Sequence, residues 1–453
     1  MKVVHYPYFT SQLNTIKKFF GQHSGVLESY MVAPRKIQGE PSLLSITGKM
    51  PNYHKMLLGP SIDVQYHLSG YGTSYEECII KYIGEGIERY ALMVAPTLLE
   101  DEIFYMSYHE IERRGEDVIP FDYISIYSDS SYKKLKQLPS LSSLSKPSKD
   151  DIIGWIKCPS LFKPNHEIWM PAQSMFVGYK TNIQRGEKRC LPGFSTGTAS
   201  YTSPKEALLG AILEWIEIDA FIVRWYTKQP SPKLIIDDTT LLANYEGILG
   251  KNSNYNIVPL YLTLPDLPVH VFGTFMVRKK EEVPYILFGS QGHLDPIAGF
   301  YRALMEASAI SYLGVYGYLF MPAEYIIDIE NRPFTDLDSN VAFYAHPTRV
   351  QQKKELLDDM ISDNTISLSS LDNLSSGNTD RDLSYVIREL NKVSKYAVYR
   401  DITPPEIADS GIHVLRVFIP ELCNMCMPGF PFTNHPRLNK YGGVQNEYPH
   451  PLP

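Results

Sequence analysis

Hydrophobic residues recur at helical spacing in three long segments of the chain. Apolar positions three or four residues apart, with charged residues between them, span residues 75–95, 204–226 and 296–318. This period predicts helices that bury one face. Short runs rich in β-branched and aromatic residues predict strands, and they lie at 255–261, 285–289 and 413–419. The mixture predicts an α/β or α+β fold.

Two polar segments interrupt this pattern, and a proline-rich segment stands at the end of the sequence. Residues 128–151 and 361–383 are rich in Ser, Asp, Asn and Lys, so we expect surface insertions there. Residues 448–453 read Tyr-Pro-His-Pro-Leu-Pro. Because proline lacks the amide donor, this tail cannot be a helix or a central strand, and we expect an extended, polyproline-like segment.

One spacing of polar residues occurs twice. In each copy a Ser is followed by Glu at +3, +11 and +14, behind a turn rich in Gly, Ser and Thr. The Ser stands where a helix N-cap belongs, and the first Glu is placed to complete a capping box. The first copy is Ser74, Glu77, Glu85 and Glu88, and the second, 129 residues later, is Ser203, Glu206, Glu214 and Glu217.

Helical geometry brings the glutamates of each copy together. At about 100° per residue they share one face of a helix whose opposite side is apolar. One interpretation is a solvated acidic face with a capping box. The other is a hard-cation site in which carboxylates from two helices converge, and this suits Mg²⁺ better than Zn²⁺ and implies a phosphate substrate. The repetition of the spacing favours the cation site.

A third helix carries a related pair. Arg302 and Glu306 are four residues apart after Asp295-Pro296, again behind a run of small residues at 289–292. The pair is either an ordinary surface ion pair or an arginine placed near nucleotide phosphates next to a further carboxylate.

Charge and composition narrow the class of partner and the compartment. Lys and Arg total 43 against 50 Asp and Glu, a net charge of −7, which argues against duplex nucleic acid as the main partner. The five cysteines are an odd number in a long chain, which is typical of a reducing compartment. His5 and Pro7 interrupt any signal-like apolar core, and no apolar run is long enough for a membrane helix. We therefore expect a soluble cytoplasmic protein that does not use a membrane.

Common catalytic motifs do not occur in the sequence. It has no Gly-x-x-x-x-Gly-Lys-Ser/Thr loop, no His-Glu-x-x-His and no Gly-x-Ser-x-Gly, and Gly70-Tyr71-Gly72 lacks the third glycine of a dinucleotide fingerprint. Cys423 and Cys426 form a lone Cys-x-x-Cys, short of the four ligands of a structural zinc site. Any nucleotide must therefore bind at an unconventional site.

These features together resemble the YcaO superfamily, enzymes that use ATP to activate peptide amides. The resemblance covers about residues 65–453 and rests on the segments 70–90, 195–220, 295–307, 400–420 and 449–453. The Pro-x-Pro-x-Pro ending resembles the azoline-forming branch, and within it the D proteins of streptolysin-S-type toxin clusters. The resemblance implies sheets flanked by helices and an ATP/Mg²⁺ site between acidic helices. It divides the chain into an N-terminal region (1–64), a catalytic domain (65–440) and a Pro-rich tail (441–453).

Carried over by position, the resemblance assigns roles to individual residues. It implies that Mg²⁺ around ATP is coordinated by Glu85, Glu88, Glu214, Glu217 and Glu306. It implies that the nucleotide is contacted by Glu206, Arg302, Arg89 and Ser195, and that the substrate is positioned or deprotonated with the help of Pro449, Pro451 and Pro453. Ile218 stands where many members have Arg, and Leu209 where many have Gln, so the second helix departs from the pattern in its phosphate and ribose contacts.

The function implied is ATP-dependent cyclodehydration of Cys, Ser or Thr in a ribosomally made precursor peptide to thiazoline or oxazoline, in toxin or bacteriocin maturation. The partners implied are the precursor peptide, a zinc-containing protein that binds its leader, and a flavin-dependent dehydrogenase that oxidises the azoline. Three alternatives stay open: amide activation for thioamide or amidine formation, an all-helical Mg²⁺-diphosphate enzyme of prenyl-transfer type, and a non-catalytic scaffold that docks peptides.

Overall fold

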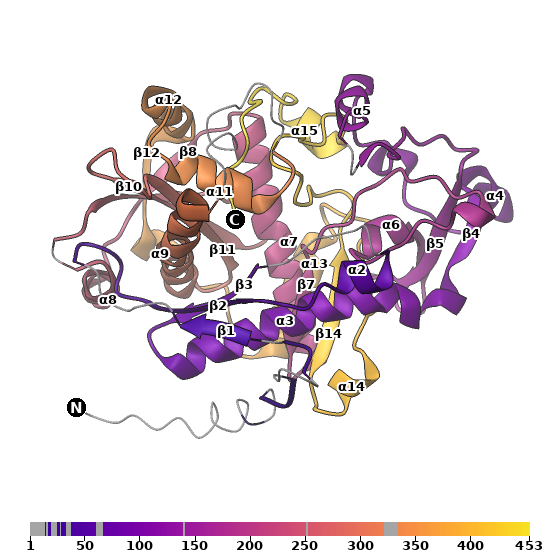
Figure 1. The fold of residues 1–453 in the computed structure, drawn as a ribbon, viewed down its shortest axis with the longest axis horizontal. Coiled ribbons are helices and arrows are strands. Elements are labelled where there is room, and N and C mark those ends of the chain that lie inside the picture. The colour runs from indigo at the N-terminus through magenta and orange to yellow at the C-terminus, as the bar shows by residue number, and fades with distance from the viewer. Residues whose placement is uncertain are drawn as a thin grey trace.

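The chain combines four β-sheets with helices that pack on their faces (Figure 1). The structure is a computed structural model, and it describes residues 14, 17–19, 25–27, 29–32, 38–59, 67–138, 141–250, 252–320 and 334–453. Much of the predicted N-terminal region 1–64 therefore lies outside the described residues. The mixed α/β class predicted from the sequence is confirmed, and the all-helical alternative is wrong because of the sheets.

Three strand–helix units form the centre of the fold. In each of them a long helix starts within a few residues of the strand end and packs back on that strand. The units are β3 (His67–Gly72) with α3 (Tyr75–Leu98), β7 (Thr198–Tyr201) with α7 (Pro204–Tyr226), and β11 (Ile286–His293) with α9 (Pro296–Phe320). These helices match the three segments in which the hydrophobic period predicted them.

Two glycines let these helices approach their strands closely. A Cβ at Gly70 would lie 1.9 Å from the carbonyl oxygen of Cys78 in α3. A Cβ at Gly289 would lie 2.3 Å from the backbone nitrogen of Ala307 in α9. Since no side chain fits at either position, the helix backbone rests directly on the strand, and side chains of the helix reach the strand's backbone amides.

The strands of the three units belong to different sheets. β3 is an edge of the antiparallel sheet β1–β2–β3, and β7 is an edge of β13–β14–β7. β11 is an edge of the five-stranded sheet β11–β10–β9–β8–β12, in which β8 and β12 run parallel. A fourth sheet has the order β4–β5–β6. The further strands are β1 (Ser29–Val32), β2 (Leu44–Lys49), β4 (Phe104–Ser107), β5 (Ile152–Pro159), β6 (Glu167–Pro171), β8 (Ser231–Ile235), β9 (Tyr255–Tyr261), β10 (His270–Arg278), β12 (Ile361–Ser367), β13 (Val398–Asp401) and β14 (His413–Phe418).

Shorter helices cover the outside of these layers. They are α2 (Tyr53–Leu57), α4 (Tyr108–Arg114), α5 (Asp129–Leu135), α6 (Ala172–Met175), α8 (Thr239–Leu249), α11 (Leu337–Ala345), α12 (Val350–Asp359), α13 (Thr379–Leu390), α14 (Pro405–Ala408) and α15 (Pro436–Lys440). Within the described ranges, no helix has the length and apolar character that crossing a membrane requires.

The two polar segments hold more regular structure than their composition predicted. Residues 128–151 contain α5, whose Tyr132 and Leu135 are buried in the main core. Residues 361–383 contribute β12, which pairs with β8 at the edge of the five-stranded sheet. An edge strand faces solvent on its unpaired side, and this explains why a polar sequence can form it.

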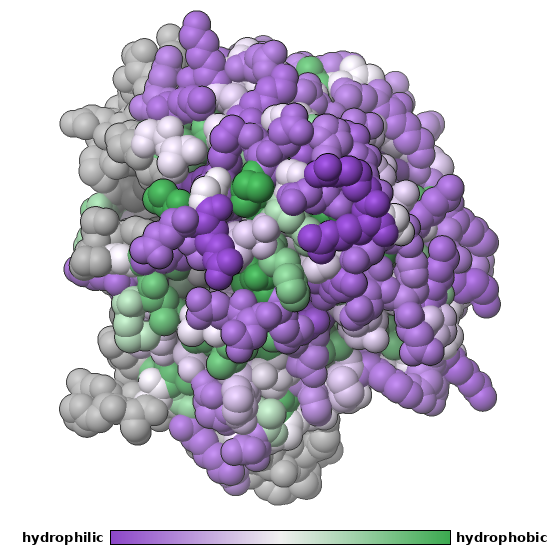
Figure 2. Space-filling view, turned by 90° about the vertical axis from the view of Figure 1, so that its right-hand side faces the viewer, coloured by the Kyte–Doolittle hydropathy of each residue, from purple (hydrophilic) through white to green (hydrophobic). Residues whose placement is uncertain are grey.

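The core surrounds α7. Every residue of this helix from Trp215 to Tyr226 is buried, and the helix crosses the middle of the molecule, with the five-stranded sheet on one side and β4–β6 on the other (Figure 1). A helix that is buried on all sides usually carries apolar residues on nearly every face. Charged residues within this stretch, such as Glu217 and Asp219, therefore need partners inside the protein. By contrast, the outer face beside α4 and α5 is mostly hydrophilic, with small separate hydrophobic areas (Figure 2).

Candidate active site

Two glutamates of α3 are held by two different strands. Glu85 accepts a hydrogen bond from the backbone N–H of Ser69 in β3, the strand of its own unit, at 2.9 Å. Glu88, one turn later, accepts from the N–H of Ser200 in β7, the strand of the next unit, at 2.8 Å. The Glu-x-x-Glu spacing therefore spans from one unit to the next.

Helix α7 repeats this arrangement. Glu214 accepts from the N–H of Gly197 immediately before β7, at 3.0 Å. Glu217 accepts from the N–H of Gly292 in β11 at 2.9 Å and from the hydroxyl of Ser290 at 2.6 Å. The second copy of the acidic spacing thus has the same pattern. One carboxylate accepts a hydrogen bond from the strand segment of its own unit, and the other accepts one from the strand of the next unit.

Helix α9 carries the first of the two glutamates that a third copy of this arrangement would contain. Glu306 accepts from the N–H of Ser290 in its own strand, at 2.8 Å. The position three residues later is Ala309, so this helix carries one such carboxylate where α3 and α7 carry two. The five glutamates therefore form one connected set along β3, β7 and β11.

Burial gives these carboxyl groups unusual acidities. Burial and then the negative charge of Glu214 raise the pKa of Glu88 to about 8. Burial raises the pKa of Glu214 to about 7, against the opposing charge of Arg89. Burial and then the charge of Glu217 raise the pKa of Glu306 to about 8. Burial also raises the pKa values of Glu85 and Glu217. Such a set of closely placed carboxylates needs added positive charge to be ionised at neutral pH.

Pairs of these glutamates, and not larger groups, are suited to bind Mg²⁺. Within the described ranges, no three acidic, His or Cys side chains gather closely enough to hold one metal ion. The largest like-charge interaction of Glu88 is with Glu214, and that of Glu306 is with Glu217. Mg²⁺ is usually bound by one or two protein carboxylates and completed by waters and substrate phosphates. When bound, it would neutralise charge on transferring phosphoryl oxygens.

The predicted serine N-cap is present in one copy of the spacing and absent from the other, and Glu77 completes no capping box because its carboxylate accepts from the N–H of Thr73. The Ser74 hydroxyl accepts from the N–H of Glu77, as expected of an N-cap. Ser203 stands at the N-cap position of α7, but its side chain makes no capping bond there. The first residues of α7 are exposed, so water can satisfy their N–H groups. Glu77 lies outside the buried set, where it forms an ion pair with Lys81 at 2.8 Å.

The residues predicted to contact the nucleotide lie on α3, on α9, on α7 and in the loop before β7. Arg89 Nη2 lies 3.5 Å from Glu85, one turn along α3. Arg302 is exposed on α9 and forms no ion pair with Glu306 in the part of the chain that the structure describes. Glu206 is half-buried in the first turn of α7, and Ser195 is half-buried in the loop before β7.

The two positions that depart from the superfamily pattern lie on α7. Ile218 is buried among core residues, and Leu209 packs against that core. Neither side chain can donate a hydrogen bond to a phosphate or a ribose.

The structure does not bring the Pro-rich tail into hydrogen-bond contact with the glutamates. Pro449 and Pro451 are buried and Pro453 is half-buried, outside any helix or strand, as the sequence predicted. Hydrogen bonds of residues 448–453 run instead to the C-terminal part of α7, to α11, to Gln352 of α12 and to the carbonyl oxygen of Cys426.

One residue of this region was not found by sequence reasoning. Arg416 in β14 is fully buried and donates to the carbonyl oxygens of Phe194 (2.7 Å) and Thr196 and to the hydroxyl of Thr198 (3.0 Å). It thereby fixes the loop that presents the Gly197 N–H to Glu214. A charged residue at the centre of the apolar run Val-Leu-Arg-Val-Phe was the available signal.

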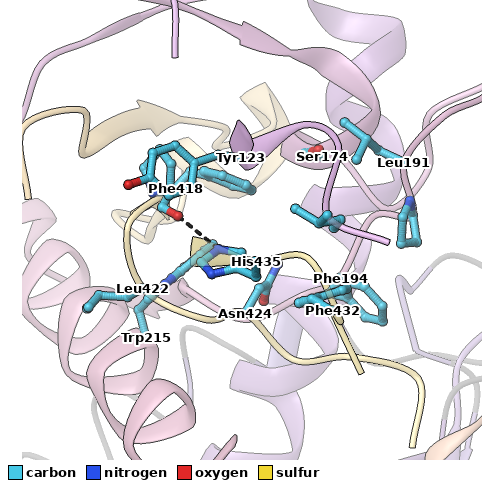
Figure 3. A pocket seen from close by; sticks show the side chains of 13 residues that line it. Tyr123, Ser174, Leu191, Phe194, Trp215, Phe418, Leu422, Asn424, Phe432 and His435 are labelled. Carbon is cyan, nitrogen blue, oxygen red and sulfur yellow. Dashed lines mark hydrogen bonds between the residues drawn. The ribbon is translucent and has the colours of Figure 1, made fainter. Parts of the chain in front are cut away.

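A separate small pocket lies beside Trp215 of α7 (Figure 3). Its walls are mainly apolar, and His435 bonds the carbonyl oxygen of Pro420 at 3.1 Å. None of the five glutamates lines it. The lining residues are Tyr123, Ile126, Ser174, Leu191, Pro192, Phe194, Trp215, Phe418, Pro420, Leu422, Asn424, Phe432 and His435.

Comparison with known families and structures gives a consistent result. Residues 69–423 match the family model described as YcaO cyclodehydratase, ATP- and Mg²⁺-binding. No curated protein matches the sequence. A heterocyclase in complex with substrate and cofactor is similar in fold, with a TM-score of 0.70 at 16% identity over 97% of this chain and 57% of the other. The chain thus spans little more than half the length of that protein.

Two shorter proteins are similar over nearly their whole length. YcaO from Methanopyrus kandleri bound with AMPPCP and Mg²⁺ has a TM-score of 0.62 at 15% identity, over 92% of this chain and 91% of the other. A chain of the E. coli microcin synthetase McbBCD complex has a TM-score of 0.58 at 15% identity, over 89% and 90%. At such identities the likeness concerns the fold.

Proposed function

The chain belongs to the YcaO family, and on that premise we propose that it is an ATP- and Mg²⁺-dependent peptide cyclodehydratase. Its substrate is a ribosomally made precursor peptide of a toxin or bacteriocin, in which Cys, Ser or Thr becomes thiazoline or oxazoline. The observation that carries the proposal is the set of five glutamates, Glu217 buried and the other four half-buried, each with one oxygen bound by a backbone N–H.

The proposed reaction needs no nucleophile from the protein. The side chain of the peptide attacks the preceding backbone carbonyl, and the resulting oxyanion takes the γ-phosphoryl group of ATP. Loss of phosphate then forms the C=N bond of the ring, so that one water is removed from the peptide and ATP becomes ADP and phosphate. Phosphorylation serves to convert a poor leaving group, a hydroxide-like oxygen, into a good one.

The roles of the individual residues are part of this proposal and come from the resemblance to the superfamily. The pairs Glu88–Glu214 and Glu217–Glu306, with Glu85, hold Mg²⁺ on the phosphates of ATP. In this proposal Arg302, which is exposed, and Arg89 contact phosphate oxygens, while Glu206 and Ser195 contact the rest of the nucleotide. Pro449, Pro451 and Pro453 belong to the tail that positions the substrate.

Partners complete the proposed system. A zinc-containing protein that binds the leader of the precursor brings the peptide to the site, and a flavin-dependent dehydrogenase oxidises azoline to azole. Two observations on similar proteins support a multi-part system. One similar protein is part of a synthetase complex, and another is nearly twice the length of this chain.

The proposal is tested by mass spectrometry of the precursor peptide together with phosphate release. Wild type, ATP, Mg²⁺, the partner and the precursor should give a mass loss of about 18 Da and one phosphate per ring, and Glu214→Ala should give neither. Phosphate release without that mass loss would favour thioamide or amidine formation. No peptide-dependent phosphate release would favour the docking scaffold.

A further inference from the structure

The Pro-rich tail is bound through its carbonyl oxygens by three side chains. We call Trp225 of α7 and Asn340 and Tyr344 of α11 the tail clamp. All three are buried. Their hydrogen bonds run from Trp225 Nε1 to Tyr448 (3.1 Å), from Tyr344 Oη to Pro449 (2.6 Å), and from Asn340 Nδ2 to His450 (2.5 Å) and Leu452 (2.8 Å).

The chemistry of the clamp matches the chemistry of the tail. Prolines at 449, 451 and 453 have no N–H, so this segment offers mainly acceptors. An extended polyproline-type segment makes no internal hydrogen bonds and leaves its carbonyl groups free. The clamp presents donors at four carbonyl groups among five consecutive residues. Recognition of Pro-rich peptides by aromatic and donor side chains follows the same logic elsewhere.

His450 fixes which residue of the tail meets which donor. Its side chain is fully buried, with its ring edgewise to those of Phe221 (6.3 Å) and Tyr226 (6.2 Å). Its Nε2 lies 3.2 Å from the carbonyl oxygen of Cys426, which can only accept, so Nε2 carries the proton. Burial lowers the pKa of His450 to about 4, and the ring is therefore a neutral anchor.

The ring of His450 packs against α7 one helical turn beyond Glu217. Phe221, which contacts His450, follows Glu217 by one turn of α7. The ring of Phe221 lies 4.6 Å from that of Phe288, two residues before Ser290 on the same face of β11. α11, which carries two members of the clamp, packs against α9 and β11. The tail is therefore packed against the same helix and strand that position Glu217 and Glu306.

We propose that Trp225, Asn340 and Tyr344 form a binding site for a polyproline-type peptide, that the chain's own residues 448–453 occupy it, and that His450 sets their register. The three clamp residues are then positioning residues for the reaction, acting through the tail. This consequence for catalysis rests on the proposed function, whereas the binding of the tail does not.

The direct test supplies the tail as a separate peptide. The protein lacking 447–453 is titrated into a fluorescein-labelled peptide Glu-Tyr-Pro-His-Pro-Leu-Pro, and binding is measured by fluorescence anisotropy. We expect saturable binding to the shortened protein and much weaker binding to the intact chain, whose own tail occupies the site. In the shortened protein Tyr344→Phe should weaken binding about 5-fold and Asn340→Ala about 30-fold, for one and two lost hydrogen bonds.

Tyr385→Phe is the matched control, because Tyr385 also donates to a proline carbonyl, that of Pro268, at 3.2 Å away from the tail. It should leave peptide binding unchanged. A peptide with Ala in place of His should bind at least about tenfold more weakly, since it loses the buried ring. Equal binding to the intact and shortened proteins, or equal effects of Tyr344→Phe and Tyr385→Phe, would overturn the proposal.

A second measurement covers the case in which the shortened protein does not fold. In the intact chain, hydrogen exchange of a fragment spanning 442–453 should become faster in Tyr344→Phe and stay unchanged in Tyr385→Phe. The same exchange rate in both variants would contradict the clamp.

The effect of the clamp on catalysis is measured separately from the binding of the tail. Tyr344→Phe and Asn340→Ala should lower kcat for ring formation with little change in ATP affinity, and the added peptide should restore turnover to the shortened protein. If wild type forms no ring, the proposed function fails while the peptide-binding result stands. If wild type is active and the clamp variants bind the tail weakly yet turn over normally, the positioning role is wrong.

Discussion

Glu217 and Glu306, on two different helices, are held side by side by a single residue between them. Ser290 of β11 donates its hydroxyl to Glu217 at 2.6 Å and its backbone N–H to Glu306 at 2.8 Å. The charge of Glu217 in turn contributes to the raised pKa of Glu306. One strand residue thus sets the separation of two carboxylates that we assign to Mg²⁺.

Ser290→Ala should weaken Mg²⁺-dependent ATP binding about 10-fold or more. The substitution removes the hydroxyl that favours the ionised form of Glu217, and losing a residue that orients a metal ligand typically costs about 10–100-fold in affinity. The matched control is Ser308→Ala, since Ser308 is also buried but donates to the carbonyl of Leu304 within α9. Calorimetric titration of ATP with Mg²⁺ measures both. Equal affinities for the two variants would contradict the role of Ser290.

The stability of the metal-free protein should fall as the pH rises. The pKa values of Glu88 and Glu306 are about 8 in the folded state against 4.5 ordinarily. The stability that their protons provide is fully present below about pH 4.5, where the unfolded chain is protonated too, and it is lost as the pH rises through about 8. We expect Tm without metal to fall by at least about 2 °C between about pH 6 and about pH 9.

Mg²⁺ should reverse this trend, because it replaces the protons and binds the ionised carboxylates. Its stabilising effect is therefore expected to grow with pH. Glu88→Gln should flatten the pH dependence, while Glu246→Gln, at an exposed position of α8, should leave it unchanged. A Tm that rises with pH in the metal-free protein would argue against buried, cation-seeking carboxylates.

Gly197→Ala should damage the site more than another substitution with the same backbone geometry. Gly197 has a φ of 81°, and a Cβ there would lie 2.6 Å from Cε3 of Trp215, so the loop must shift and withdraw its N–H from Glu214. Gly411 has a φ of 71° but open space around it, so Gly411→Ala carries only the conformational cost of about 1 kcal/mol. We expect Gly197→Ala to lower both the free energy of unfolding and the ATP affinity, and Gly411→Ala to lower only the former. Chemical denaturation and titration separate the two effects.

The sequence predicted those parts of the site that local patterns encode. The period of the apolar residues predicted α3, α7 and α9, and the repeated spacing indicated Glu85, Glu88, Glu214 and Glu217 as one kind of feature. Both signals are properties of a single helix, in which every third or fourth residue shares a face. Glu306 was noted with Arg302 on the third helix, its role as a metal ligand came from the resemblance, and the structure shows that it follows the same strand–helix arrangement.

The relations between elements could not be predicted in this way. That Glu88 reaches Ser200, or Glu217 reaches Gly292, depends on which strands lie beside which helices, and neither spacing nor composition carries that information. Arg416 illustrates the same limit, since its partners lie about 220 residues earlier in the chain. The strand in the polar segment 361–383 could not be predicted for a related reason: an edge strand such as β12 needs pairing on one side only, so its sequence resembles that of a loop.

The measurement that tests the central claim most directly is the affinity of the intact chain for ATP with and without Mg²⁺, for wild type, Glu214→Gln and Glu246→Gln. It needs neither partner nor precursor peptide. The account predicts that Mg²⁺ strengthens ATP binding in wild type and in Glu246→Gln, and that Glu214→Gln loses more than about tenfold of the Mg²⁺-dependent affinity. Binding that is independent of Mg²⁺, or the same in all three proteins, would contradict the assignment of these five glutamates to Mg²⁺.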